Sequence, residues 1–326
     1  CDGNLGCLPV WGSNTPEKRV EFASAASAGD AVVRRTGMAY FLAVANRKGG
    51  VGKSTITVML AHALSIWGGK RVLIIDLDSQ CNASMIMLGG EGWVEARSAR
   101  RTIADYFSDS FSNRMSRPGA YVLDRVGDVV DGGGRQPPLS ILPGSLLLDD
   151  GQGELFLLAA DNRAASDISV GLRERLIETL RRFENDYDVI ILDCAPGLSF
   201  AALAGLKMAD KVVVPFRADY VSLLAVDRVA LMIEERRDLD DLAQVPLSRR
   251  RYACLANFVR DNGRERLLIE EIGLAHPVFA TELPQRDGIA NSFDWLPQST
   301  SMDEKYGNAV SDVRSLYDEI IPLMRR

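Results

Sequence analysis

A glycine-rich segment with two lysines carries the first chemistry that the sequence suggests. It reads Asn46-Arg-Lys48-Gly-Gly-Val-Gly-Lys53-Ser-Thr and follows the apolar run Tyr40–Ala45. A buried strand that leads into such a turn and then into a helix presents backbone N–H groups to phosphate oxygens at the positive helix end. In that arrangement Lys53 reaches the β- and γ-phosphates, and the Ser54 hydroxyl takes a Mg²⁺ position. The segment predicts a nucleoside triphosphate site built from Gly49, Gly50, Val51, Gly52, Lys53, Ser54 and Thr55.

The segment departs from the strict phosphate-loop pattern at its first position. The strict pattern begins with a glycine where this chain has Arg47, and a second lysine, Lys48, stands five residues before Lys53. The extra lysine therefore distinguishes this loop from an ordinary phosphate loop.

Three aspartates follow predicted buried strands. Asp76 and Asp78 end the segment Arg-Val-Leu-Ile-Ile-Asp-Leu-Asp, and Asp193 ends Val-Ile-Ile-Leu-Asp. Asp76 and Asp78 lie on one face of an extended chain, at the strand end that faces the ligand in α/β nucleotide folds, so they address Mg²⁺ and the attacking water. Asp193 has the form of a Walker B residue that holds Mg²⁺ through a water, with Pro196 and Gly197 as the γ-phosphate switch.

Composition describes an ordinary globular chain. Of its 326 residues 47% are hydrophobic and 25% are charged, and the net charge is −6. The negative charge argues against a globally basic nucleic-acid binder, although local basic patches remain compatible with it. No run approaches 18 apolar residues, so no membrane insertion is expected. Five cysteines form no CxxC pair, which suits reduced thiols in a cytosol.

Apolar runs alternate with helical patterns from Tyr40 onward. This alternation predicts an α/β fold, a mostly parallel twisted sheet with helices on both faces. The predicted strands are Tyr40–Asn46, Arg71–Leu77, Leu139–Leu142, Tyr187–Asp193, Lys211–Pro215 and Arg251–Asn257. The predicted helices are Lys53–Trp67, Val170–Phe183, Phe200–Lys207, Ser222–Arg236, Arg264–Ile272 and Asp303–Ile321.

The domain organisation is simple. Residues 1–38 mix Gly, Ser, Ala and charge and are expected to form a partly ordered extension. Residues 39–326 are expected to form one phosphate-loop domain. Clusters of Gly and Pro within 89–138 predict a long, partly irregular insertion in that domain.

Together these motifs resemble the ParA branch of the ParA/MinD ATPases, which carry a deviant Walker A loop. The resemblance rests first on Lys48–Thr55, Asp76–Ser84 and Asp193–Ser199. It extends to Ile141–Leu148 and Val212–Val226, and in motif order it covers roughly residues 40–322.

The resemblance implies roles for the two lysines and for Asp78. Lys48 corresponds to the family's signature lysine, which crosses the interface of an ATP-sandwich dimer to the partner's phosphates. A second cation there offsets the charge of two facing triphosphates. Lys53 corresponds to the phosphate-loop lysine, and Asp78 resembles the switch I aspartate needed for hydrolysis.

The resemblance also implies a metal site and a base contact. Ser54, Asp76 and Asp193 resemble the Mg²⁺-site residues of the family. Asn257, at the end of the last predicted strand, resembles the position that contacts adenine. The expected ligands are therefore ATP and Mg²⁺.

ParA relatives that bind DNA do so non-specifically, through basic residues of the ATP-bound dimer. Around Pro284 the family pattern Pro-Arg-Asn-x-Arg is replaced by Pro-Gln-Arg-Asp-Gly, so the expected arginines are displaced. Each phosphate that is neutralised makes binding salt-dependent. The candidates in this chain are Arg260, Arg264, Arg266, Arg286 and the triplet Arg249–Arg251.

The function that follows from the resemblance is slow ATP hydrolysis stimulated by a ParB-like or cargo-adaptor partner. A homodimer formed on ATP binds DNA and drives partitioning or positioning of DNA or a large cargo. Such a protein is expected to be cytoplasmic and nucleoid-associated. The alternative is a MinD-like ATPase, tethered to membrane or protein and without DNA binding.

Three other interpretations have weaker support. A membrane-binding tail needs a basic amphipathic helix, but residues 313–326 hold acidic residues and a proline. An iron–sulfur carrier needs paired cysteines, and residues 126–133 have aspartate where a cysteine ligand is required. A module that only senses ATP would not need both Asp78 and Asp193.

Overall fold

The computed structural model describes most of the chain beyond the N-terminal segment. The described residues are 38–112, 114, 117–150, 153, 165–197, 199–260, 262–291, 294–296 and 298–324. The extension predicted at residues 1–38 lies outside the described residues, except for its last one.

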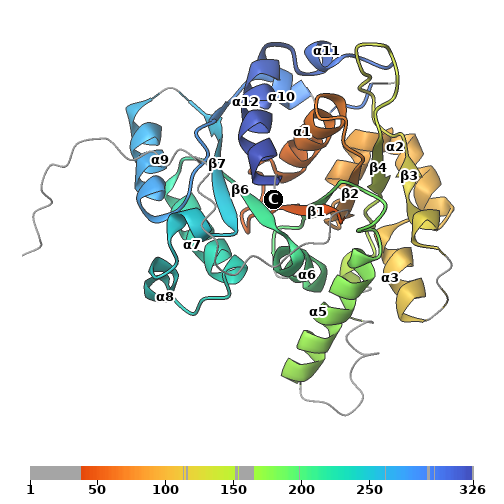
Figure 1. Ribbon diagram of the computed structural model, residues 1–326, viewed down its shortest axis with the longest axis horizontal. Coiled ribbons are helices and arrows are strands. Elements are labelled where there is room, and N and C mark those ends of the chain that lie inside the picture. The colour runs from red at the N-terminus through yellow and green to blue at the C-terminus, as the bar shows by residue number, and fades with distance from the viewer. Residues whose placement is uncertain are drawn as a thin grey trace, which may run out of the picture.

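The described residues form one eight-stranded sheet at the centre of the molecule (Figure 1). Its strand order is β3-β4-β2-β5-β1-β6-β7-β8. Every neighbouring pair is parallel except β3 with β4. The strands are β1 (Tyr40–Val44), β2 (Val72–Leu77), β3 (Leu123–Asp124), β4 (Leu139–Leu142), β5 (Val189–Cys194), β6 (Lys211–Phe216), β7 (Tyr252–Val259) and β8 (Leu283–Pro284).

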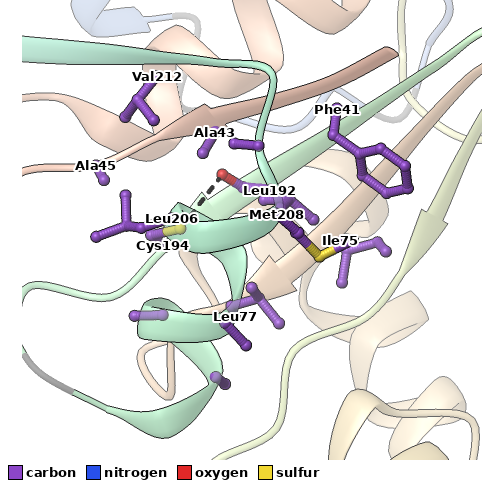
Figure 2. Packing of buried hydrophobic residues seen from close by; sticks show 14 of the residues in the cluster. Phe41, Ala43, Ala45, Ile75, Leu77, Leu192, Cys194, Leu206, Met208 and Val212 are labelled. Carbon is purple, nitrogen blue, oxygen red and sulfur yellow. Dashed lines mark hydrogen bonds between the residues drawn. The ribbon is translucent and has the colours of Figure 1, made fainter. Parts of the chain in front are cut away.

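Both faces of the sheet are buried, which explains why its strands read as continuous apolar runs. Along β1, Phe41 and Ala43 enter one hydrophobic core, while Leu42 and Val44 enter the other. Figure 2 shows the first core, where Phe41 and Ala43 lie among residues of neighbouring strands and of α6 (Phe200–Met208). Because successive side chains of a strand point to opposite faces, a strand covered on both sides has no polar face.

Helices cover the two faces in separate groups. The first core is closed by α6 and by α3 (Ile103–Phe111), α5 (Ala165–Arg181), α7 (Tyr220–Ile233), α8 (Leu239–Ala243) and α9 (Gly263–Ala275). The second core is closed by α1 (Lys53–Ile66), α2 (Asn82–Ser98), α10 (Asp287–Asn291), α11 (Met302–Tyr306) and α12 (Val310–Ile320). The predicted fold class is confirmed.

The short helices α8 and α10 and the first half of α2 were not predicted, and the structure differs from the predicted elements in three further places. The two-residue strands β3 and β8 are too short to give a sequence pattern. The helix predicted over Asp303–Ile321 is broken near Gly307, which has φ +51°. The predicted insertion 89–138 contains α3, the second half of α2 and a short 3₁₀ turn at Pro118–Tyr121.

The strand order brings the chemical motifs to one edge. β1 lies between β5 and β6, and the chain leaves β1 toward one face of the sheet and β5 toward the other. In open α/β sheets, ligands bind beyond the carboxyl ends of the strands at such a reversal of strand order. The loops that follow β1, β2, β5, β6 and β7 all start from this edge.

Candidate functional site

The loop after β1 has the backbone of a phosphate cradle. Gly50 and Gly52 adopt φ of +68° and +88°, a region that side chains disfavour. A Cβ atom on Gly52 would lie 2.4 Å from Nδ2 of Asn257, whereas one on Gly49 or Gly50 would meet nothing within 4 Å. α1 begins directly after Gly52 with no side-chain cap, so its first N–H groups face the loop opening. The predicted loop thus has the geometry that anion binding requires.

The carboxylate of Asp193 is held at the carboxyl end of β5. Thr57 of α1 donates a hydrogen bond to Oδ1 at 3.0 Å, while the buried Oδ2 has no hydrogen-bond partner. Burial, followed by the charge of neighbouring Asp76, raises the pKa of Asp193. An unpaired buried oxygen is costly, and a nearby cation would offset that cost. Asp193 therefore fits a Mg²⁺-site residue.

Asp76 is placed beside Asp193 by the parallel register of β2 and β5, but its oxygens are already engaged. Ser84 donates to Oδ2 through its hydroxyl at 2.6 Å and its N–H at 2.9 Å, and the Asp78 N–H donates to Oδ1 at 3.1 Å. Burial raises the pKa of Asp76 against these bonds. Asp76 thus shapes the turn from β2 to α2, which places Asp78.

Asp78 lies in that turn and accepts a 2.9 Å hydrogen bond from the Gln80 N–H. The buried ammonium of Lys53 feels the charges of Asp193 and Asp78. Burial lowers the pKa of Lys53, and the two carboxylates act in the opposite direction. The ammonium also lies 3.5 Å from the Lys48 carbonyl. These residues form one charged cluster beneath the loop.

Among the described residues, no group of three or more His, Cys, Asp and Glu side chains is arranged to hold a metal ion. Mg²⁺ that binds with a nucleotide keeps several waters and uses one or two protein oxygens plus phosphate oxygens. Ser54, at the start of α1, and Asp193 supply such oxygens. The described cysteines, Cys81, Cys194 and Cys254, are buried and unlinked.

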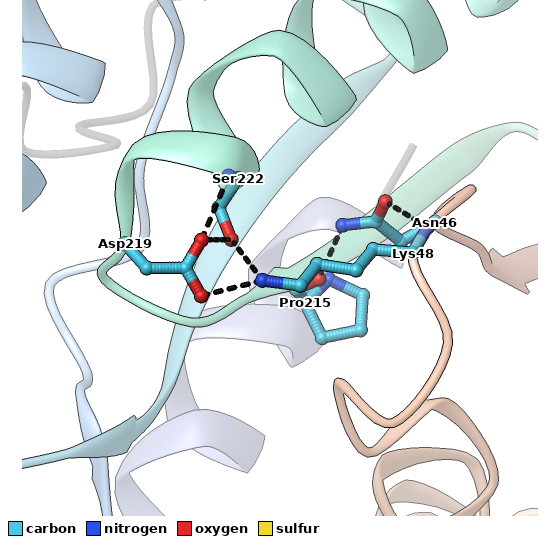
Figure 3. A network of polar contacts seen from close by, with 5 residues as sticks. All are labelled: Asn46, Lys48, Pro215, Asp219 and Ser222. Atoms are coloured by element: carbon cyan, nitrogen blue, oxygen red, sulfur yellow. Dashed lines mark hydrogen bonds and ion pairs between the residues drawn. The ribbon is translucent and has the colours of Figure 1, made fainter.

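Lys48 points away from the loop toward the start of α7 (Figure 3). Its ammonium lies 2.5 Å from Oδ2 of Asp219 and 3.4 Å from Oγ of Ser222. Asn46 braces the loop, because its Oδ1 accepts the Lys48 N–H at 3.0 Å and its Nδ2 donates to the Pro215 carbonyl at 2.7 Å. The two lysines of the motif therefore face different surroundings.

Asn257 holds the loop from the other side. Its Nδ2 donates to the Val51 carbonyl at 2.8 Å, and its Oδ1 accepts the N–H of Phe258 at 2.9 Å. Phe258 has φ +58° at an irregularity of β7, and the guanidinium of Arg217 lies 4.1 Å above its ring. The predicted adenine contact is thus adjacent to the phosphate loop and one residue before a strained aromatic residue.

Several residues that hold the site were not identified from the sequence: Asn46, Thr57, Ser84, Asp219, Ser222 and Phe258. Asp219 had a readable signal, because an aspartate before an apolar helical run is an N-cap pattern. Its side chain accepts the Ser222 N–H as the cap of α7. Nothing in the sequence pairs it with Lys48, which is 171 positions away.

The candidate DNA-binding arginines have different surroundings. Arg264 lies over the Tyr220 ring, 5.3 Å from its centre, and Arg260 contacts Gln285 at 3.3 Å. Arg286 forms a 2.7 Å ion pair with Asp312 of α12.

The triplet Arg249–Arg251 is not a free basic surface. Arg250 is buried and donates to the carbonyls of Leu242 and Val245. Arg251 donates to carbonyls of Lys207 and Ala209, near the end of α6. These two arginines join chain segments to one another.

The sheet, the cradle and the carboxylates define a phosphate-loop nucleotide-binding protein. A family profile described as an AAA domain matches residues 39–242, well over half of the chain. The chain belongs to the ParA/Soj branch of the ParA/MinD ATPase family.

Curated relatives are similar in sequence over part of their length. The sporulation initiation inhibitor protein Soj of Bacillus subtilis is 29% identical over 187 residues, covering 57% of this chain and 61% of that protein. The chromosome-partitioning ATPase Soj of Thermus thermophilus is 32% identical over 197 residues, covering 60% and 62%. The matched stretches span less than two thirds of these relatives.

Solved structures share the fold. A putative plasmid partition protein from Borrelia burgdorferi bound to AMPPNP has a TM-score of 0.60 at 16% identity, covering 87% of this chain and 99% of that chain. Cobyrinic acid a,c-diamide synthase from Mycobacterium smegmatis, with an ATP analog and magnesium, has a TM-score of 0.62 at 20% identity, covering 88% and 96%. At these identities the likeness shows the fold alone.

No helix in the described parts of the chain has both the length and the apolar character needed to cross a membrane.

Proposed function

We propose that this chain is a slow ATPase that dimerises on ATP, binds DNA as the dimer and releases it after hydrolysis. The observation that carries the proposal is the divergence of the two lysines in one loop. Lys53 is buried under the loop near Asp78 and Asp193, while Lys48 lies outside it at the start of α7. A single nucleotide engages only Lys53, which leaves Lys48 for the phosphates of a facing copy.

The loop residues would bind and orient the nucleotide. Backbone N–H groups of Gly49 to Thr55 would hold the phosphates, with Asn257 keeping the Val51 carbonyl turned away from them. Mg²⁺ would be held by the Ser54 hydroxyl and, through water, by Asp193. It would neutralise charge that develops on the phosphates.

Asp78 would orient the attacking water. Its carboxylate is positioned by the turn that Asp76 and Ser84 hold in place. Turnover would stay slow until a partner changes the site. A ParB-like or cargo-adaptor protein is the partner that this family position suggests.

DNA binding would use exposed arginines near the ends of β7 and α9. Arg260 and Arg264 are exposed, whereas Arg286 forms an ion pair with Asp312. Binding through phosphates would be independent of sequence and sensitive to salt. A dimer of this kind would be found on the nucleoid of the cell.

The test is binding to random-sequence duplex DNA with ATP, with ADP and without nucleotide, at several salt concentrations. The dimer is followed in parallel by sedimentation. We expect binding and dimer only with ATP, and an affinity that falls as salt rises. Binding in none of these states would favour the tethered, MinD-like alternative.

Two single variants sharpen the test. Arg264→Ala should reduce the slope of log affinity against log salt by about 0.9 for each DNA phosphate that the variant no longer neutralises. Arg286→Ala is the matched control, because its guanidinium is already paired with Asp312. Equal reductions in the two variants would contradict the assignment of Arg264.

A further inference from the structure

Lys48 is held within its own protomer by a preformed anion. Oδ1 of Asp219 accepts the N–H of Ser222 at 2.9 Å and its hydroxyl at 3.0 Å, which fixes the carboxylate at the start of α7. The second oxygen, Oδ2, is then left facing Lys48, whose ammonium lies 2.5 Å away (Figure 3). The hydrogen bonds of the helix cap hold Asp219 in place independently of Lys48.

An ammonium that is paired in this way cannot at the same time contact phosphates on another molecule. The proposed function requires Lys48 to reach the facing copy, and the structure holds it against its own α7. The two contacts therefore compete for one cation. A ligand or partner shifts such an equilibrium only by its difference in affinity for the two states.

We infer that Asp219 is an intramolecular latch on Lys48, which opposes dimerisation until ATP on a facing copy supplies a stronger anion. This inference rests on the proposed ATP-dependent dimer. It assigns to Asp219 a regulatory role in that same site. The latch raises the ATP concentration at which the dimer forms.

The expected effect of the latch on dimerisation is modest for one protomer and larger for the dimer. The side chains of Lys48 and Asp219 are 26% and 43% exposed. A pair this exposed shifts an equilibrium by about 1.4- to 5-fold. Because each dimer releases two latches, the association constant should change by the square, about 2- to 25-fold.

The experiment uses Asp219→Asn in the full chain. Asparagine caps a helix about as well as aspartate, so α7 keeps its first turn. The substitution removes the charge that Lys48 contacts. Asp238→Asn is the matched control, because Asp238 caps α8 through the Asp241 N–H and has no contact with Lys48.

Two measurements are made on wild type and both variants. Sedimentation with increasing ATP gives the dimer association constant. Limited acylation without nucleotide, followed by mass spectrometry, gives the labelling rate of Lys48 relative to Lys70. We expect Asp219→Asn to dimerise at lower ATP and to label Lys48 about 1.4- to 5-fold faster, with Asp238→Asn behaving as wild type.

The outcomes test the latch separately from the proposed dimerisation. If Asp219→Asn changes neither measurement, or if it weakens dimerisation, there is no latch. A Lys48 labelling rate that rises while no protein dimerises with ATP would overturn the proposed function but confirm that Asp219 restrains the lysine. The same changes in Asp238→Asn would show that loss of a helix cap, and not release of Lys48, is the cause.

Discussion

Two buried aspartates differ in the partners of their carboxylates. Asp128 lies in the insertion, and Asp193 lies at the end of β5. Oδ2 of Asp128 accepts hydrogen bonds from the Lys305 ammonium at 2.5 Å and from the Leu296 N–H at 2.9 Å. Lys305 also donates to the Asp294 carbonyl at 2.6 Å. In contrast, Oδ2 of Asp193 has no partner.

This difference suggests that Asp128 stabilises the fold, whereas Asp193 is suited to bind a cation. Burying a charge is costly unless it is paired and hydrogen-bonded. At Asp128 the protein itself supplies a cation and a backbone N–H to Oδ2, and so joins the insertion to α11. At Asp193 one oxygen lacks a partner, next to a loop with the geometry for phosphate. Three predictions test this contrast.

The largest effect is expected from removing Lys305. Lys305→Met leaves the Asp128 carboxylate buried without its cation, which should lower the free energy of unfolding by about 3–5 kcal/mol. Urea denaturation measures it. The double variant Asp128→Asn/Lys305→Met should recover much of the loss, because it buries no unpaired charge.

An exposed pair provides the control for that prediction. Arg314 and Asp318 of α12 form an ion pair at 3.3 Å with side chains 53% and 58% exposed. Asp318→Asn, which leaves the contacts of Arg314 with the Trp67 and Tyr317 rings in place, should therefore cost no more than about 0.5 kcal/mol. A loss in Lys305→Met as small as this would mean that the buried pair does not hold the insertion.

The second prediction concerns Asp193→Asn. Removing this carboxylate should slow single-turnover ATP hydrolysis by about 10- to 100-fold, the usual cost of losing a residue that orients a metal. The unfolding free energy should change little, because the amide oxygen can still accept from Thr57. A stability loss comparable to that of Lys305→Met would make Asp193 a structural residue.

The two aspartates also differ in how well the sequence predicts them. Asp193 follows an apolar strand at the edge where the loops meet, so strand pattern and motif order locate it. Asp128 lies in a segment without periodicity, and its partner Lys305 is 177 positions away. Local patterns report elements and their order, whereas a pairing across the fold depends on packing that no short segment contains.

The same reasoning applies to the arginines and to Lys48. The run of three arginines predicts a basic surface at Arg250. In the structure Arg250 is buried and donates to backbone carbonyls. The motif identifies Lys48, but only the structure shows that Asp219 holds it. Sequence therefore predicted the phosphate loop and the sheet, but not the contacts that restrain the loop.

The third prediction uses a buried histidine of α1 next to the Asp128–Lys305 pair. His62 shares a 2.8 Å hydrogen bond between Nδ1 and the Tyr306 hydroxyl, while its buried Nε2 has no partner. Burial, opposed by Asp128 and reinforced by Lys305, lowers the pKa of His62 to about 4. His62 thus feels the charges of the Asp128–Lys305 pair but forms its own hydrogen bond with Tyr306.

The sign of the pH effect follows from that shift. The unfolded chain protonates His62 near its ordinary pKa of about 6.5, whereas the folded protein does so only near 4, so stability falls as pH drops between these values. From pH 7 to pH 5 the histidine should cost about 2 kcal/mol of unfolding free energy. His62→Gln should lack this component, so urea denaturation at the two pH values should show a smaller loss than in wild type. Equal losses would mean that His62 is protonated without cost, and that its unpaired nitrogen can reach water.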